Sequence, residues 1–160
     1  MSAAADPVAG NGANAVPDAM QHALDRLVAQ FEALSPTSTE ELAALYTENA
    51  FFKDPFNEVH GREKIAVIFA HMFAQVDAPR FIVTTRVAQG MDAFLTWDFR
   101  FCMRRFSSDE QCIRGASHLK FTADGSVCFH RDYWDAAEEL YEKLPLLGSL
   151  MRFLKRRAAQ

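Results

Sequence analysis

Several features that mark common classes of protein are missing from this sequence. Its three cysteines are an odd number with no CxxC spacing, which argues against a disulfide framework and favours free thiols in a reducing compartment. The chain has no tight metal-ligand motif, no glycine-rich nucleotide fingerprint and no flavin motif. We therefore expect neither a bound metal nor a cofactor.

Positive charge and long apolar runs are also scarce. The formal net charge is −4, which argues against a nucleic-acid partner because phosphate contacts need a basic surface. No stretch approaches membrane-spanning length, and the N-terminal stretch has no Lys or Arg before an apolar run. We expect a protein that works in the cytoplasm, away from membranes.

The chain is rich in hydrophobic residues, phenylalanine among them. It contains 14 Phe, and its 160 residues are 49% hydrophobic and 24% charged, as in a single globular domain with a large apolar interior. Residues 1–17 have little to bury and predict a disordered tail. The domain proper is expected over 18–144, followed by an amphipathic, basic extension over 145–160 that packs on the domain or a partner subunit.

Hydrophobic spacing predicts three helices in the first half of the chain. One begins at Asp18 and ends before Ser35-Pro36, and a short one opens at a candidate capping box of Ser38 and Glu41. A third follows Gly61 and is broken at 77–79. The first predicted helix has an apolar face at the three-four spacing: Leu24, Leu27, Val28, Phe31 and Leu34.

Strands dominate the second half. A short strand at 50–53 precedes the third helix, and four more are predicted at about 80–88, 93–106, 111–122 and 126–134, with Gln89-Gly90 and Asp124-Gly125 among the turns. Helices followed by an antiparallel meander predict an α+β domain whose helices pack on one sheet face. A strongly curved sheet would leave a hollow beneath it.

Two of these strands alternate polar and apolar side chains, so each has two distinct rows. In strand 93–106 the polar row is Thr96, Asp98 and Arg100, and the ring row is Trp97, Phe99 and Phe101. In strand 126–134 one row holds His130, Asp132 and Trp134. We expect both polar rows to face the hollow, where acid, base and cation converge. The ring row would then lie on the convex face and form a homodimer contact.

The order of elements resembles the SnoaL-like branch of the nuclear transport factor 2-like superfamily over about residues 20–145. The motifs that carry the resemblance are Phe52-Lys53-Asp54-Pro55, Gly61 at a helix start, and His130-Arg131-Asp132-Tyr133-Trp134-Asp135. It implies a cone-shaped fold whose last strand turns His130, Asp132 and Trp134 inward. It also implies that Ser117, rather than His118, faces the cavity.

Relatives within that superfamily suggest roles for single residues. Asp54 stands where ketosteroid isomerases have their general base, but Gln30 or Phe31 and Ser117 stand where those enzymes hold the enolate oxygen. Steroid isomerisation is therefore not expected.

Two other relatives point to the strand residues. Limonene epoxide hydrolases use an Arg-Asp pair on a central strand, which Asp98 and Arg100 match in reverse order, and a last-strand Asp, which Asp132 matches. The residues that position water in those enzymes would fall near Phe52 and Asp54. SnoaL-type cyclases use a carboxylate and a His, which Asp132 and His130 supply.

Each candidate also has a plain structural interpretation. Asp98, Arg100 and Asp132 could be an acid-base cluster or an ion-pair network. His130 beside Asp132 could be a proton carrier or a satisfied core histidine, and Asp54 could line a pocket or only form a turn.

The predicted function is binding of a small, partly apolar molecule. If the protein is an enzyme, the chemistry would be cofactor-free isomerisation, cyclisation or hydrolysis by general acid-base catalysis. His130 or Asp132 would act as base, and Asp98 and Arg100 complete the catalytic set, with Arg100 stabilising negative charge. The substrate-binding candidates are Asp54, Thr96, Ser117 and Trp134. The alternative is a non-catalytic ligand-binding or dimerisation module.

Overall fold

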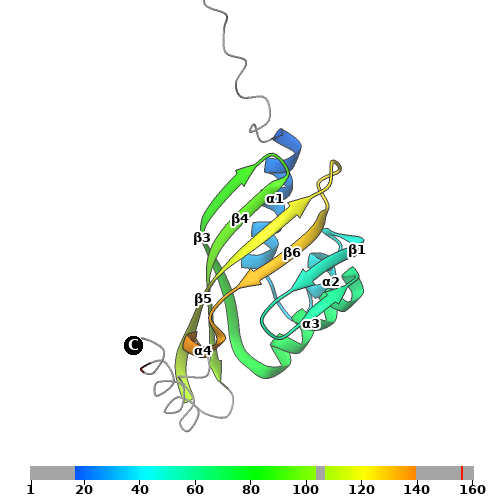
Figure 1. Cartoon of the computed structure of the whole chain (residues 1–160). Helices are drawn as coiled ribbons and strands as arrows, with labels where there is room; N and C mark the ends of the chain where they lie inside the picture. Colours follow the sequence, from blue (N-terminus) through cyan, green and yellow to red (C-terminus); the bar gives the residue numbers. More distant parts are fainter. Residues whose placement is uncertain (1–16, 104–106, 140–155, 157–160) are drawn as a thin grey trace, which may run out of the picture.

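The computed structural model describes residues 17–103, 107–139 and 156 (Figure 1). The predicted N-terminal tail lies outside this part of the chain except for Pro17. The predicted basic extension lies outside it except for Arg156.

Between residues 17 and 139 the described part of the chain has four helices: α1 (Asp18–Glu32), α2 (Thr39–Ala43), α3 (Arg62–Gln75) and α4 (Ala136–Glu139). The apolar face predicted for α1 is confirmed, since Leu24, Leu27 and Phe31 are all buried. The predicted capping box is wrong, because Ser38 makes no side-chain cap on α2 and its hydroxyl is hydrogen-bonded to Ser35 instead.

The strands form one six-stranded sheet that is curved and not closed into a barrel (Figure 1). They are β1 (Tyr46–Lys53), β2 (Glu58–His60), β3 (Val76–Gln89), β4 (Asp92–Met103), β5 (Ser107–Phe121) and β6 (Val127–Tyr133). Their order is β2-β1-β6-β5-β4-β3, with β1 and β6 parallel and all other neighbours antiparallel. The sheet is therefore mixed but mainly antiparallel.

Several details of the sheet differ from the sequence prediction. The three-residue strand β2 was not predicted, β1 begins at Tyr46 rather than at residue 50, and β5 begins at Ser107 rather than near residue 111. β3 begins at Val76, directly after α3, rather than near residue 80. Asp77-Ala78-Pro79 does not separate the two elements. It sits within β3 at a shift in the pairing register, where Ala78 has a φ of +48°.

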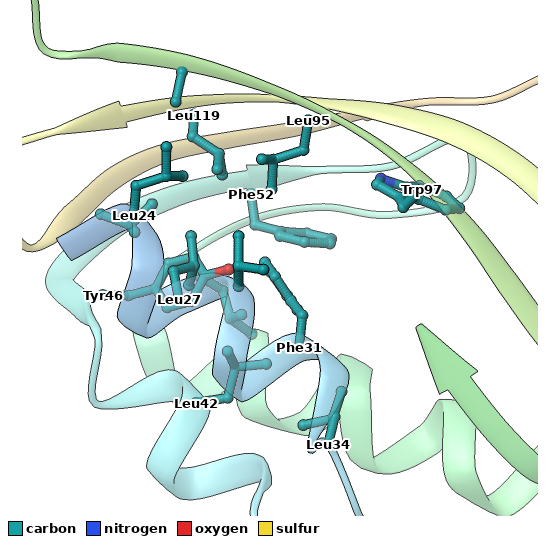
Figure 2. Packing of buried hydrophobic residues seen from close by; sticks show 14 of the residues in the cluster. Leu24, Leu27, Phe31, Leu34, Leu42, Tyr46, Phe52, Leu95, Trp97 and Leu119 are labelled. Carbon is teal, nitrogen blue, oxygen red and sulfur yellow. The ribbon is translucent and has the colours of Figure 1, made fainter. Parts of the chain in front are cut away.

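α1 and α3 pack on the concave face of the sheet and close the core, and α2 packs against these two helices (Figure 1). Figure 2 shows Leu24, Leu27 and Phe31 of α1 pointing toward the sheet, where Leu95 of β4 and Leu119 of β5 meet them. Burying these side chains supplies the main favourable free energy of folding.

The face of β4 that points inward is the opposite of the one expected. Trp97, Phe99 and Phe101 are buried against the core at 7%, 7% and 4% exposure, whereas the polar row of β4 lies on the convex face. The prediction that Thr96, Asp98 and Arg100 face the hollow is wrong, and so is the placement of the rings on the outside. Three rings gain far more from burial than three polar groups, which would have to shed water.

On the convex face the polar row of β4 finds partners at the surface. Arg100 contacts Asp98 and Glu110, each at 3.3 Å between nitrogen and oxygen, and the hydroxyls of Thr96 and Thr84 are 2.7 Å apart.

None of the helices in the described ranges is long and apolar enough to cross a membrane.

Candidate active site

A cavity of about 910 Å³ lies between the concave face of the sheet and α3. Among the described residues, eight aromatic side chains line it: Phe52, Phe56, Phe69, Phe81, Trp97, Phe99, Phe101 and Trp134. Several of these rings also pack on one another, as Phe81 does on Phe99 with 4.5 Å between ring centroids. Of the two carboxylates in the described wall, Asp54 and Asp132, Asp132 is the one attached to a hydrogen-bond network in the core.

The network begins at the carboxylate of Asp132 on β6. The hydroxyl of Ser117 on β5 donates to Asp132 Oδ1 at 2.5 Å, and the indole N–H of Trp97 on β4 donates to Ser117 Oγ at 2.9 Å. Three adjacent strands therefore each supply one member. Because Trp97 occupies the lone-pair side of Ser117, the serine proton is directed toward the carboxylate.

His130 binds the same carboxylate oxygen from the core side. Its Nε2 lies 2.8 Å from Asp132 Oδ1, and its Nδ1 lies 2.7 Å from the hydroxyl of Tyr46. A carboxylate only accepts, so Nε2 carries the proton that it donates to Asp132. Burial, and then the charge of Asp132, raise the pKa of Tyr46 well above its usual value of 10.0. The phenol therefore stays protonated and can donate to Nδ1.

Aromatic rings fix the imidazole of His130 in this position. The ring stacks on Tyr46 and meets Phe31 and Phe52 edge-on, with centroids 4.9–6.0 Å apart. His130 is 1% exposed and is not part of the cavity wall. It reaches the cavity through Asp132, whose side chain is 17% exposed.

Trp97 can lie where it does because its partner on β5 is a glycine. Gly115 pairs with Trp97 across the two strands, and a Cβ at position 115 would come within 2.3 Å of the indole. A glycine inside a strand often marks such a close approach. This space lets the indole lie over β5 and extend its N–H to Ser117.

Asp54 lies at the cavity wall, but its oxygens are taken up by the turn after β1. The backbone N–H groups of Phe56 and Asn57 donate to Oδ1 at 2.7 and 2.6 Å, and the Asn57 amide donates to both oxygens. This is the turn-forming arrangement weighed from the sequence.

The structure brings together five of the eight predicted site residues. His130, Asp132 and Ser117 are connected, Trp134 and Asp54 share the cavity wall, and Thr96, Asp98 and Arg100 are on the other face. Ser117 is buried and His118 half-buried on the opposite face, as the resemblance implied.

Sequence reasoning missed three members: Tyr46, Trp97 and Gly115. Gly115 carried a signal, since glycine is unfavourable inside a strand. Tyr46 carried none, because it meets a histidine 84 residues further along the chain.

A second hollow, of about 480 Å³, adjoins the cavity and shares Asp54, Asp132 and Trp134 with it. Its wall also includes Lys53 and Arg131. Within the described ranges, no group of three or more His, Cys, Asp or Glu side chains is placed to hold a metal ion.

Comparison with known proteins agrees with the cone-shaped α+β architecture. The family model of the SnoaL-like domain matches residues 27–130, which is more than half of the chain. The protein belongs to the SnoaL-like domain family. A search among proteins of curated function finds no match.

Solved structures with this fold are distant in sequence. A protein of ketosteroid isomerase-like fold from Catenulispora acidiphila, in complex with trimethylamine, is 15% identical with a TM-score of 0.64, over 79% of this chain and 92% of that one. A limonene epoxide hydrolase-like enzyme of M. tuberculosis is 13% identical with a TM-score of 0.59, over 76% and 85%. A nuclear transport factor 2-like protein of unknown function from Burkholderia pseudomallei is 12% identical with a TM-score of 0.65, over 76% and 95%.

Proposed function

We propose that this protein binds a small, largely apolar molecule in the concave cavity and exchanges a proton with it through Asp132. The observation that carries the proposal is that Asp132 lines the cavity while its Oδ1 is held by Ser117 and His130. A fixed carboxylate beside an apolar ligand is suited to general acid-base catalysis, because its position is set before the ligand arrives.

The other members of the network are positioning residues in this proposal. Ser117 and His130 both bind Oδ1 of Asp132, and the proposal assigns the proton exchange to the other oxygen, Oδ2. Tyr46 fixes the imidazole from behind. Arg100 has no part in the reaction because it lies on the convex face.

The reaction class is cofactor-free proton transfer, as in isomerisation, cyclisation or addition of water. A carboxylate acting alone can take a proton from carbon or from water and return it to the product. The alternative is a ligand-binding module without chemistry, which the same apolar cavity would also support.

A model reaction separates these two functions without knowledge of the natural substrate. A base that takes the ring C–H proton of 5-nitrobenzisoxazole breaks its N–O bond and releases a coloured cyanophenolate. We expect the wild type to exceed the rate of acetate at equal concentration, and Asp132→Asn to lose most of the excess. The matched control is Asp98→Asn, which removes a carboxylate from the other sheet face. Binding without turnover would favour the module.

We also propose that the convex face pairs with a second copy of this chain. A row of ring and apolar side chains crosses all six strands there, each in pairing register or ring contact with the next: His60, Phe51, Phe129, His118, Phe94 and Val87. The flanking charges are of both signs, with Asp92 and Lys120 at 3.2 Å, so two antiparallel copies present opposite charges to each other.

Oligomeric state tests this second proposal. Phe94 is 51% exposed on the convex face and Val67 is 52% exposed on α3, so Phe94→Glu and Val67→Glu are a matched pair. Sedimentation should show a dimer for wild type and Val67→Glu and a monomer for Phe94→Glu. Equal behaviour of the two variants would contradict it.

The thiols support a reducing location. Cys102, Cys112 and Cys128 form no disulfide with one another, and we propose the cytoplasm as the place where the protein works.

A further inference from the structure

The charged side chains in the described wall of the cavity are carboxylates. Asp54 and Asp132 line it, and no Lys or Arg does so within the described ranges. The wall also has one histidine, His71, which is exposed on α3. The field inside this part of the cavity is therefore negative, and it attracts a positive ligand more strongly because the walls are apolar.

Aromatic rings stand beside the carboxylate that faces the cavity. Trp134 follows Asp132 by two residues, so both side chains point to the same sheet face. Phe56 meets Trp134 nearly at right angles, with ring centroids 5.3 Å apart and 77° between the planes. The faces of such rings carry partial negative charge and attract cations, most strongly in the case of tryptophan.

The end of α3 adds a third contribution of the same sign. Residues of its last turns, among them Met72 and Gln75, line the cavity, and the last turn holds no basic side chain. The C-terminus of a helix carries partial negative charge and favours a nearby cation. Carboxylate, ring faces and helix end come from three separate elements, so their agreement does not follow from one local feature.

We propose that the natural ligand of this cavity is a cationic amine with apolar substituents, such as a tertiary or quaternary alkylammonium. The ammonium group lies between Asp132 and the rings of Trp134 and Phe56, and the apolar part extends along the rings of β4. This assignment of ligand class rests on the proposed function of the cavity. It follows from the charge and ring chemistry of the wall.

Two cationic side chains, Lys53 and Arg131, line the adjoining second hollow, and both have partners of their own. Lys53 is ion-paired with Glu58, and the guanidinium of Arg131 lies 4.7 Å from the ring centre of Tyr133. By strand alternation, Arg131 points to the sheet face opposite Asp132. These groups therefore leave the negative field on the cavity side in place.

Three probes of equal shape test the ligand class on the full chain: benzyltrimethylammonium, its neutral carbon analogue neopentylbenzene, and the anion phenylmethanesulfonate. Binding is followed by tryptophan fluorescence, since both tryptophans of the chain line the cavity. We expect the cation to bind about tenfold more tightly than the neutral analogue and the anion to bind more weakly than either.

Variants of the cavity wall test which side chains cause the preference for the cationic probe. Asp132→Asn should reduce the affinity for the cation about tenfold and leave that for neopentylbenzene within about twofold, and Trp134→Leu should shift the ratio in the same direction. Asp98→Asn, on the other face, should change neither affinity.

Equal or tighter binding of the neutral analogue overturns the amine assignment and leaves the proposed apolar-ligand function standing. Tighter binding of the anion also overturns the assignment. Absence of binding by all three probes overturns both proposals.

Discussion

The two faces of the sheet carry their polar groups in different ways. On the convex face of β4, Asp98 and Arg100 are ion-paired at the surface, where their side chains are 22% and 38% exposed. On the concave face of β6, His130 and Asp132 are joined to Ser117 by short hydrogen bonds inside the core. Water reaches the Asp98–Arg100 pair, whereas the His130 side chain is 2% exposed and water cannot replace its partners. The carboxylate of Asp132 is therefore held from the core side, which is what the proposed chemistry requires.

The comparison predicts unequal costs for removing one histidine from each face. His130→Ala leaves the buried Tyr46 hydroxyl without its partner, leaves Asp132 with Ser117 alone and opens a cavity, so the free energy of unfolding should fall by about 3 kcal/mol. His118→Ala removes a half-buried ring that pairs with Asp92, and should cost less than about 1 kcal/mol. Urea denaturation measures both. Equal costs would remove the distinction between the faces.

Crowding on the concave side is tested at Gly115. Gly115→Ala places a methyl group against the indole of Trp97, so we expect a loss of about 2 kcal/mol and a changed near-ultraviolet circular dichroism spectrum. In a Trp97→Phe background the same substitution should cost less, because the smaller ring can give way. A cost that does not depend on residue 97 would contradict the close approach.

Alkaline pH probes the tyrosine behind His130. The pKa of Tyr46 is raised in the folded protein, first by burial, so the stability linked to it is complete below the unfolded pKa of about 10 and is lost as pH rises toward the folded value. Between pH 9 and 11 the wild type should lose stability more steeply than Tyr46→Phe, by about 1.4 kcal/mol per pH unit above pH 10. Tyr133→Phe, on the exposed face of β6, should keep the wild-type slope.

The smallest effect is expected at the surface ion pair. A double-mutant cycle of Asp98→Asn and Arg100→Gln should give a coupling of about 0.5 kcal/mol that shrinks in 0.5 M salt, because both side chains contact water. A coupling above about 2 kcal/mol, insensitive to salt, would mean that the convex face holds its charges as firmly as the core does.

Much of this fold could be predicted from local patterns. Periodicity predicted the buried face of α1, the four strands β3 to β6, and which side chains of a strand share a face. It can do so because the backbone repeat fixes the direction of each side chain. Periodicity also predicted that His130, Asp132 and Trp134 share a face, and the resemblance to relatives gave the correct inward direction.

The sequence alone was not sufficient to predict which face of β4 points toward the core. Alternation states which residues share a face but not which face is inside, and a slip of one residue exchanges them. The decisive factor is the burial of Trp97, Phe99 and Phe101 against the helices. The contact of Tyr46 with His130 could not be predicted either, since it depends on β1 and β6 lying parallel and adjacent.

Nuclear magnetic resonance of the histidine rings tests the central claim most directly. If His130 donates from Nε2 to Asp132 inside the core, one of the five histidines should show a slowly exchanging Nε2 proton and an unprotonated Nδ1. That signal should shift or disappear in Asp132→Asn and remain unchanged in Asp98→Asn. The claim that this carboxylate is held from within the core would be contradicted by either of two results. The first is a ring N–H of His130 that exchanges freely with water, and the second is a His130 signal that does not change in Asp132→Asn.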